Sequence, residues 1–338
     1  MFTEKQYIFV FLVIAIGFSQ VAVLADGLYG EAIGVVGYSD NGQWIGKSGH
    51  SLKNALGFEY FQNFSNDYGN FLTADLQARV SYDSSEDSRD AWAVEVHNAW
   101  LERPLGLGKF IRVGHFDPAF GLEPVLDTHG TLLQTLASKN IGFKKDWGVG
   151  YRGLLGDYDF EIASQLGSGM GIKRTDGSFL LSSRISTPDR AGTQYGVSFL
   201  YGKTLESMQA RTIPAPRLVT DRAIQKRRIG FDMQRPVGPF GFKGEIAAGD
   251  DDGTMVAGAL VQFDYTVPEA QSLVMKLQGI YWSNDWDKKD ARDLTVAPVL
   301  EYKATSSLTA RLGYFHDFKS SRGDEDRMVV LELYYFGK

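Results

Sequence analysis

Long stretches in which apolar and polar residues alternate are the feature of this sequence that most constrains its fold. In residues 70–82, the apolar Leu76 and Val80 lie at one parity, and the polar Gln77 and Arg79 lie at the other. Successive side chains of a β-strand point to opposite faces, so this alternation predicts strands with one apolar face and one polar face. The same pattern returns in two later segments, 254–265 and 294–303.

The alternating segments are long, about 9–13 residues, which suits the tilted span of a membrane strand. Strands of soluble proteins are commonly nearer ~5–6 residues, although a secreted β-sandwich is an alternative that also alternates. About sixteen such segments are recognisable, an even number typical of outer-membrane barrels. They are 29–38, 52–62, 70–82, 91–102, 109–117, 141–152, 157–167, 178–187, 194–203, 226–235, 239–249, 254–266, 271–282, 293–303, 308–318 and 327–336.

The connections between these segments alternate between tight links, such as 153–156, and long polar loops, such as 204–225. Short periplasmic turns opposite longer outer loops are typical of barrels in the outer membrane of Gram-negative bacteria. The sequence therefore predicts an all-β protein, a transmembrane antiparallel up-and-down β-barrel of about sixteen strands over residues 26–338, with a water-filled lumen. Aromatic residues near the strand ends are expected to form the two interfacial girdles. They are Tyr29, Tyr38, Tyr60, Trp92, Trp100, Trp147, Tyr158, Tyr201, Tyr265, Tyr281, Trp282 and Phe318.

The first 25 residues have the layout of a signal peptide. A short polar start with Lys5 precedes the apolar run 7–18, and Val23 and Ala25 suit signal-peptidase cleavage before Asp26. The apolar run is shorter than the ~20 residues that a spanning helix needs. Residues 1–25 are therefore expected to direct export and to be removed.

Composition excludes several classes of function. The chain has no Cys, which removes disulfides, thiolate metal sites and covalent haem attachment. Its formal net charge is −6, whereas a nucleic-acid-binding protein is normally basic. The five His residues show no spacing typical of a metal site. We therefore predict no catalytic residues, no metal, no cofactor and no nucleic-acid partner.

Residues 111–123, with the sequence IRVGHFDPAFGLE, resemble a recurrent strand-and-loop entry of the phosphate-selective porin family. The matching positions are Arg112, Gly114 and Phe116, then Pro118 and the segment 120–123. This resemblance implies a sixteen-stranded barrel, commonly trimeric, that passes small anions. The expected partners are outer-membrane lipid and lipopolysaccharide, small solutes, and other copies of the chain in a homotrimer.

Seven basic residues at predicted inward positions are candidates for the charge that lines the lumen: Arg79, Arg112, Arg184, Arg228, Lys243, Lys276 and Arg311. Acidic residues at the same parity oppose them: Asp75, Glu95, Asp232, Glu245, Asp264 and Glu301. Members of the family that select phosphate have a densely basic lumen. The resemblance supports a porin, whereas the mixed lining leaves its solute open, with anions such as phosphate as one option.

A wide barrel needs a loop folded inward if it is to select solutes. The connection at 118–140 is the best candidate, with a short helix predicted over 131–137. Two alternatives stay open: an outer loop without a gating role, and a second constriction from the basic segment 203–235. The residues that the first candidate would bring to the narrow zone are Asp127, His129, Lys139, Lys144 and Lys145.

Two functions suit such a barrel. The first is a porin, a passive diffusion channel for small hydrophilic solutes. The second is a sheath for a partner, such as a periplasmic multihaem cytochrome that forms an electron conduit through the membrane. An open lumen favours the first function, and haem that co-purifies favours the second.

The signal-peptide assignment is tested by sequencing the N-terminus of the protein purified from an outer-membrane fraction. We expect the mature chain to begin at Asp26, because signal peptidase cleaves after small residues such as Ala25. A purified chain that still begins at Met1 would contradict the assignment and would favour an uncleaved membrane anchor.

Overall fold

Each long strand pairs with the next strand along the chain in antiparallel register, which turns the alternation of the sequence into two faces of one sheet. The computed structural model describes residues 27–46, 53–84, 91–188, 192–207, 218–321 and 326–338. The predicted signal peptide, residues 1–25, lies outside these described residues. The strands are β1 (Leu28–Ser39), β2 (Gly42–Trp44), β3 (Asn54–Asn66), β4 (Gly69–Tyr82), β5 (Trp92–Gly106), β6 (Lys109–Phe116), β7 (Asp146–Leu155), β8 (Tyr158–Gln165), β9 (Phe179–Ser186), β10 (Gln194–Ser207), β11 (Leu218–Val237), β12 (Phe240–Asp251), β13 (Thr254–Thr266), β14 (Leu273–Ser283), β15 (Arg292–Lys303), β16 (Leu308–Lys319) and β17 (Arg327–Gly337).

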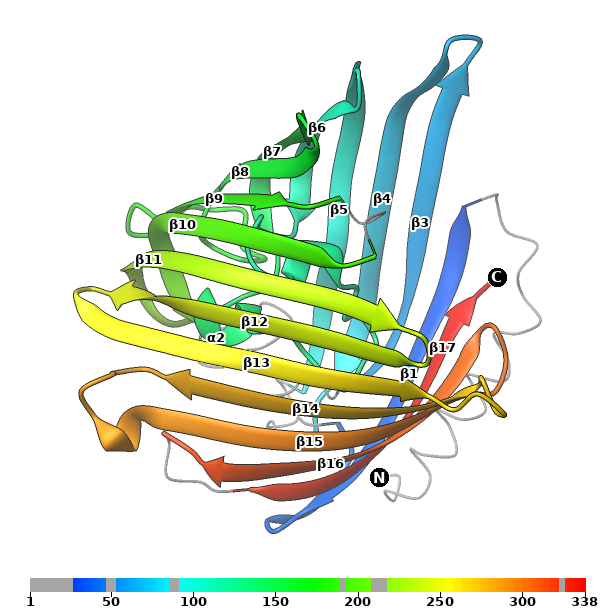
Figure 1. Cartoon of the computed structure of the whole chain (residues 1–338), viewed down its shortest axis with the longest axis vertical. Coiled ribbons are helices and arrows are strands. Elements are labelled where there is room, and N and C mark those ends of the chain that lie inside the picture. The colour runs from blue at the N-terminus through cyan, green and yellow to red at the C-terminus, as the bar shows by residue number, and fades with distance from the viewer. Residues whose placement is uncertain (1–26, 47–52, 85–90, 189–191, 208–217, 322–325) are drawn as a thin grey trace.

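The sheet closes because β1 has a barrel partner on both sides. Ala32 faces Leu56 of β3 on one side and Tyr335 of β17 on the other. The three-residue strand β2 only folds back onto the end of β1, so sixteen long strands form the barrel wall (Figure 1). This confirms the predicted antiparallel barrel of sixteen strands.

Short and long connections lie at opposite ends of the barrel, as expected. Two-residue links 67–68, 107–108 and 156–157 connect strands at the end where β1 begins and β17 ends. The long connection 117–145 starts at the other end of the barrel. The two-residue link 252–253, between β12 and β13, lies at that end too and is an exception to the longer connections there. The helices are brief: the 3₁₀ turns η1 (Glu123–Val125) and η3 (Lys289–Ala291), and the α-helix α2 (Ala137–Asn140). No helix in the described part of the chain has the length and apolar character needed to cross a membrane.

The two faces of the wall differ in chemistry as the alternation predicts. On β12 and β13, the apolar Ile246 and Val261 are exposed on the outside, whereas the polar Glu245 and Gln262 are buried on the inside. Aromatic residues such as Tyr38, Trp92 and Tyr158 are exposed near strand ends, where a girdle is expected.

Two predicted boundaries and the predicted place of Trp282 in a girdle differ from the structure. Residues 141–145 belong to the inward connection rather than to β7, because Ile141 and Phe143 are buried inside the barrel. β10 and β11 extend into the loop predicted at 204–225, of which 208–217 lie outside the described residues. Trp282 is only 1% exposed and packs inside the barrel, so its assignment to the girdle is wrong.

The assignment of the two faces is tested by placing a charge on each face of β13. We expect Val261→Arg to lower the free energy of unfolding by about 2–4 kcal/mol, because Val261 lies near the middle of an outward face that contacts lipid. Gln262→Arg is the matched control, since its side chain lies inside beside Asp264 and its cost should be smaller. Urea titration in lipid vesicles measures both. A larger loss for Gln262→Arg would contradict the assignment.

Candidate functional site

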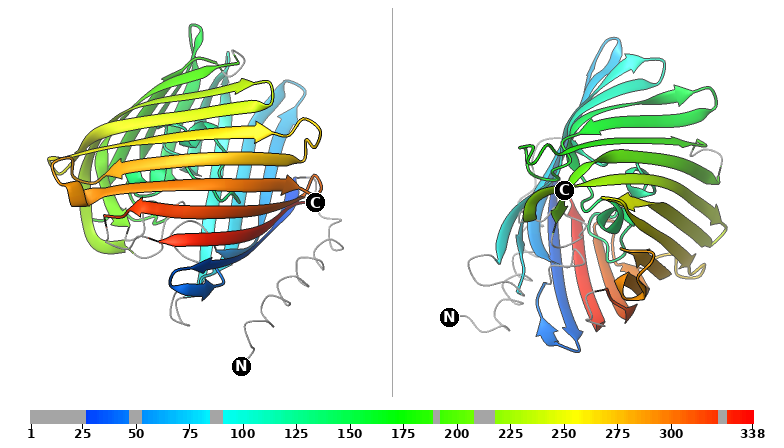
Figure 2. Two further views of the ribbon diagram at one scale, coloured as in Figure 1. Left: turned by 60° about the horizontal axis from the view of Figure 1, so that its bottom comes forward. Right: turned by 90° about the vertical axis from the view of Figure 1, so that its left-hand side faces the viewer.

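The connection between β6 and β7, residues 117–145, folds into the barrel and is called here the inner loop. Its side chains Leu122 and Leu136 are fully buried, and Leu132 is 1% exposed. Figure 2 shows this segment enclosed by the strands. A loop buried along its length in this way is part of the barrel interior rather than a free outer loop.

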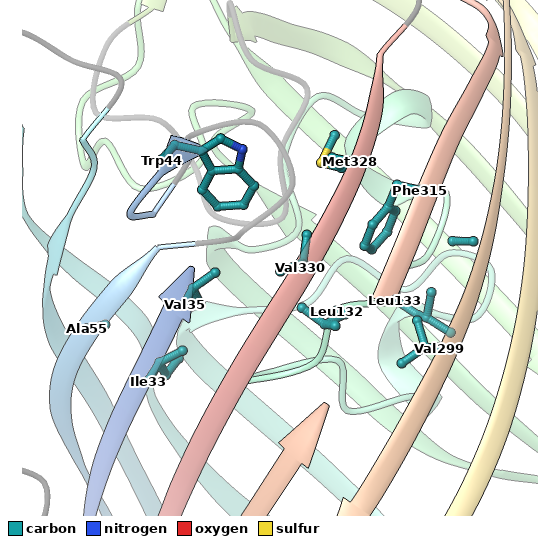
Figure 3. Packing of buried hydrophobic residues seen from close by; sticks show 11 residues of the cluster. Ile33, Val35, Trp44, Ala55, Leu132, Leu133, Val299, Phe315, Met328 and Val330 are labelled. Atoms are coloured by element: carbon teal, nitrogen blue, oxygen red, sulfur yellow. The ribbon is translucent and has the colours of Figure 1, made fainter. Parts of the chain in front are cut away.

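Apolar side chains hold the inner loop against the wall at three places. Leu132 and Leu133 pack against Val299, Phe315 and Val330 (Figure 3). Burial of each large apolar side chain contributes about 1.5–3 kcal/mol. The other two contacts join Phe120, Ile141 and Phe143 to Leu180, Leu200 and Trp282, and Leu122 and Leu136 to Leu260.

The first part of the inner loop is fixed by hydrogen bonds from its backbone to wall side chains. The N–H of Ala119 donates to Ser182 Oγ at 2.9 Å, and the N–H of Gly121 donates to Ser198 Oγ at 3.0 Å. The N–H of Leu122 donates to Glu245 Oε2 at 3.2 Å. Gly121 has φ +62°, and a Cβ there would lie 2.3 Å from Glu245 Oε1. Only glycine satisfies this close approach with a positive φ.

The later part of the inner loop is fixed mainly to the opposite side of the barrel, on β14, β15, β16 and β1, while Arg228 of β11 holds it to the same side as its first part. Side chains on five wall strands contact this later part of the loop. Because the two parts of the loop are bound to strands on different sides of the barrel, the loop crosses the lumen. The contacts are Arg228 Nε to Asn140 Oδ1 at 2.9 Å, Gln278 Nε2 to the carbonyl of Gln134 at 3.0 Å, Asp293 Oδ2 to Lys139 Nζ at 2.6 Å, Arg311 Nη1 to the carbonyl of Gly130 at 2.5 Å, and Glu31 to His129.

The helix predicted over 131–137 is wrong, and the only α-helix of the inner loop is α2. Thr131 Oγ1 donates to the carbonyl of Leu133 at 2.7 Å, and Gln134 Nε2 donates to the carbonyl of Thr131 at 2.6 Å. Local bonds of this kind compete with a helical backbone. In addition, Leu132 and Leu133 both contact the wall, which gives the segment another stable conformation.

A buried acid–base pair joins the two halves of the inner loop. Lys144 Nζ lies 3.4 Å from Glu123 Oε1 and also donates to Gln134 Oε1 at 2.6 Å. Thr135 and Thr128 complete the hydrogen bonds of the two charged groups. Burial raises the pKa of Glu123 and lowers the pKa of Lys144, while their mutual attraction opposes both shifts. Lys144 therefore holds the loop together and does not face the lumen.

His129 joins the tip of the inner loop to the wall. Its Nε2 contacts Glu31 of β1, and its ring centroid lies 4.0 Å from that of His97. Arg79 Nη1 lies 3.8 Å from the same Glu31 carboxylate and Arg79 Nε lies 2.8 Å from Glu95. The loop tip is thus part of a charged network on β1, β4 and β5.

A cavity of about 370 Å³ remains between the inner loop and strands β3–β6 and β17. Three of the five predicted constriction residues line it: Asp127, His129 and Lys145. The other two do not, because Lys144 is buried within the loop and Lys139 pairs with Asp293 on β15. Trp100 also lines this cavity, so it faces inward and is not part of a girdle.

The seven predicted lumen cations lie on the inner face, and each has an acidic partner within 4 Å. Three of the partners, Glu102, Asp251 and Glu332, were not among the predicted inward acids, although Glu332 lies between the exposed Leu331 and Leu333 and the alternation marks it as inward. The pairs are Arg79–Glu95 at 2.8 Å, Arg112–Glu102 at 2.8 Å, Arg184–Asp232 at 2.6 Å, Arg228–Asp251 at 2.5 Å, Lys243–Asp264 at 2.5 Å, Lys276–Glu301 at 2.9 Å and Arg311–Glu332 at 2.6 Å. Among the described residues, no group of three His, Asp or Glu side chains is arranged to hold a metal ion.

Solved structures with this fold include an anion-selective porin and an outer-membrane channel, DcaP of Acinetobacter baumannii. The anion-selective porin from Comamonas acidovorans matches with a TM-score of 0.62 and 12% identity, over 91% of this chain and 98% of that chain. OprB of Pseudomonas putida matches with a TM-score of 0.62 and 10% identity, over 95% and 96%. OmpF of Salmonella typhi matches with a TM-score of 0.61 and 13% identity, over 91% and 96%. No family model and no curated protein sequence matches the chain. These likenesses establish the fold of a porin.

The role of the buried pair is tested by removing one partner and then both. We expect Lys144→Met to lower the free energy of unfolding by about 3–5 kcal/mol, because it leaves the Glu123 carboxylate buried without a cation. Adding Glu123→Leu should restore much of the loss. Lys139→Met is the control, since its pair is partly exposed and is worth about 1 kcal/mol or less. Equal losses for the Lys144 and Lys139 variants in urea titrations would contradict this role.

Proposed function

We propose that the protein is a porin of the Gram-negative outer membrane, a passive diffusion channel for small hydrophilic solutes. The observation that carries this proposal is the inner loop, which crosses the lumen of a closed sixteen-stranded barrel and leaves a polar cavity beside it. A barrel of this size is too wide for its own side chains to fill. An inward loop lined with charge is what such a lumen needs to restrict and select solutes.

The alternative function, a sheath for a multihaem cytochrome, finds less support. The inner loop is tied to strands on opposite sides of the barrel, through Ser182 on β9 and Arg311 on β16. A protein partner inside the lumen would have to displace these anchors and expose Leu132 and Leu136. A small solute needs only the space that the loop leaves free.

The assembly and location of the protein follow as parts of the same proposal. An apolar outer face suits contact with membrane lipid and lipopolysaccharide, and the expected signal peptide at 1–25 suits export. A homotrimer is also proposed. One solved structure with this fold, OmpT of Vibrio cholerae, is described in a trimer form, with a TM-score of 0.58, 12% identity, and coverage of 91% of this chain and 98% of that chain.

The preference for anions such as phosphate stays a prediction. It came from the resemblance of residues 111–123 to the phosphate-selective porin family, and each of the seven lumen cations has an acidic partner in the structure. A paired cation contributes less field to the lumen than a free one. These residues therefore give little support for strong anion selection.

The proposed function is tested by recording single channels of the detergent-purified mature chain in a planar bilayer. We expect discrete conductance steps, and larger steps when residues 126–136 are replaced by a short Gly-Ser linker that opens the lumen. Replacement of the outer segment 286–290 by the same kind of linker is the control and should leave the step size unchanged. Silence from a barrel shown to be folded, especially with haem absorbance in the preparation, would contradict the porin and favour the sheath.

A further inference from the structure

We infer that the passage beside the inner loop favours small cationic solutes, through the carboxylates of Glu59, Asp75 and Asp127. This inference rests on the proposed function, because it names the class of solute that the channel prefers. All three residues line the cavity of about 370 Å³. Glu59 and Asp75 lie on the wall, on β3 and β4, and Asp127 lies across from them on the inner loop.

Glu59 and Asp75 are brought together by the register of their strands. Glu59 faces Gln77 and Phe61 faces Asp75, so the two acids are diagonal neighbours on the inner face. Both side chains line the same cavity, so the two carboxylates are close neighbours. Two carboxylates at this distance repel unless a proton or a cation lies with them.

One oxygen of Asp75 has no partner within the described part of the protein. Asp75 is only 5% exposed. Its Oδ2 accepts a hydrogen bond from Asn98 Nδ2 at 2.8 Å. Oδ1 has no hydrogen-bond donor. A buried carboxylate oxygen without a donor costs free energy, which a cation passing through the cavity would offset.

The basic groups around the same cavity are already engaged. Lys145 Nζ contacts both oxygens of Asp117, at 2.7 and 2.8 Å. Arg112 lies 2.8 Å from Glu102, and its guanidinium stacks 4.4 Å from the ring centroid of Trp100.

Two further charged groups at the cavity are also paired. Glu123 has Lys144 as its partner, and His129 contacts Glu31. His97 and Tyr334 complete the titratable groups that face the cavity, and both rings pack on that of His129.

Within the described residues, no ion pair neutralises the carboxylates of Glu59, Asp75 and Asp127, whereas the acids Asp117 and Glu123 have cationic partners. Fixed negative charge in a narrow, low-dielectric passage raises the local concentration of cations and excludes anions. The inner loop strengthens this effect, because it packs on the opposite part of the wall and leaves the larger space, about 370 Å³, beside β3–β6, against about 70 Å³ on its other side.

The inference is tested by the reversal potential of the detergent-purified mature chain in a planar bilayer under a KCl gradient. We expect the sign that indicates K⁺ preference. The double variant Glu59→Gln/Asp75→Asn should reduce the ratio of K⁺ to Cl⁻ permeability by about twofold or more, and Asp127→Asn should reduce it less because its side chain is exposed to more water. Asp290→Asn, an exposed acid in the outer connection 284–291, is the control and should leave the ratio unchanged.

Conductance steps with Cl⁻ preference would overturn the inference and leave the porin intact. Steps with K⁺ preference that the double variant leaves unchanged would also overturn it, because the charge would then come from other residues. Absence of steps from a folded barrel would overturn the proposed function itself, and this inference with it.

Discussion

The pairing of β1 with β17 is the constraint on which the rest of the structure depends. A bilayer offers no water to backbone N–H and C=O groups, so a membrane-spanning sheet must leave no open edge. The antiparallel register from Gly30–Gly337 to Ser39–Met328 removes that edge. Once the sheet is closed, each strand must present an apolar face to lipid and is free to present charge to the lumen, which is the alternation seen throughout the sequence.

Closure creates a second physical problem, because a barrel of sixteen strands encloses more space than its wall side chains fill. The inner loop fills part of this space. It is held there by buried leucines, by backbone hydrogen bonds to wall side chains and by an internal Glu123–Lys144 pair, the interactions that also stabilise an ordinary protein core. The segment 111–123, which resembles a porin family, contains the residues whose backbone N–H groups bind wall side chains. Glycine is required at position 121 because the backbone there lies directly against the side chain of Glu245.

The sequence predicted what depends on local periodicity and missed what depends on contacts between distant strands. Strand parity placed Arg79 and Arg311 inside correctly, because alternation fixes the face of each residue. Glu31, a partner of Arg79, lies on β1 with β3 between it and β4, and only the arrangement of the strands in the closed sheet brings the two side chains close. The short helix predicted in the inner loop failed for the same reason, since packing of Leu132 and Leu133 on β15, β16 and β17 decides that segment.

In the proposed channel, solutes pass between the inner loop and the wall of β3–β6. The absence of native Cys allows a direct measurement of this passage, by single-channel recording of Asp127→Cys during exposure to a thiol-specific methanethiosulfonate reagent. We expect a stepwise fall in conductance when the thiol is modified, and no change for Leu331→Cys, whose side chain is exposed on the outer face. An unchanged conductance after demonstrated modification at residue 127 would contradict this passage.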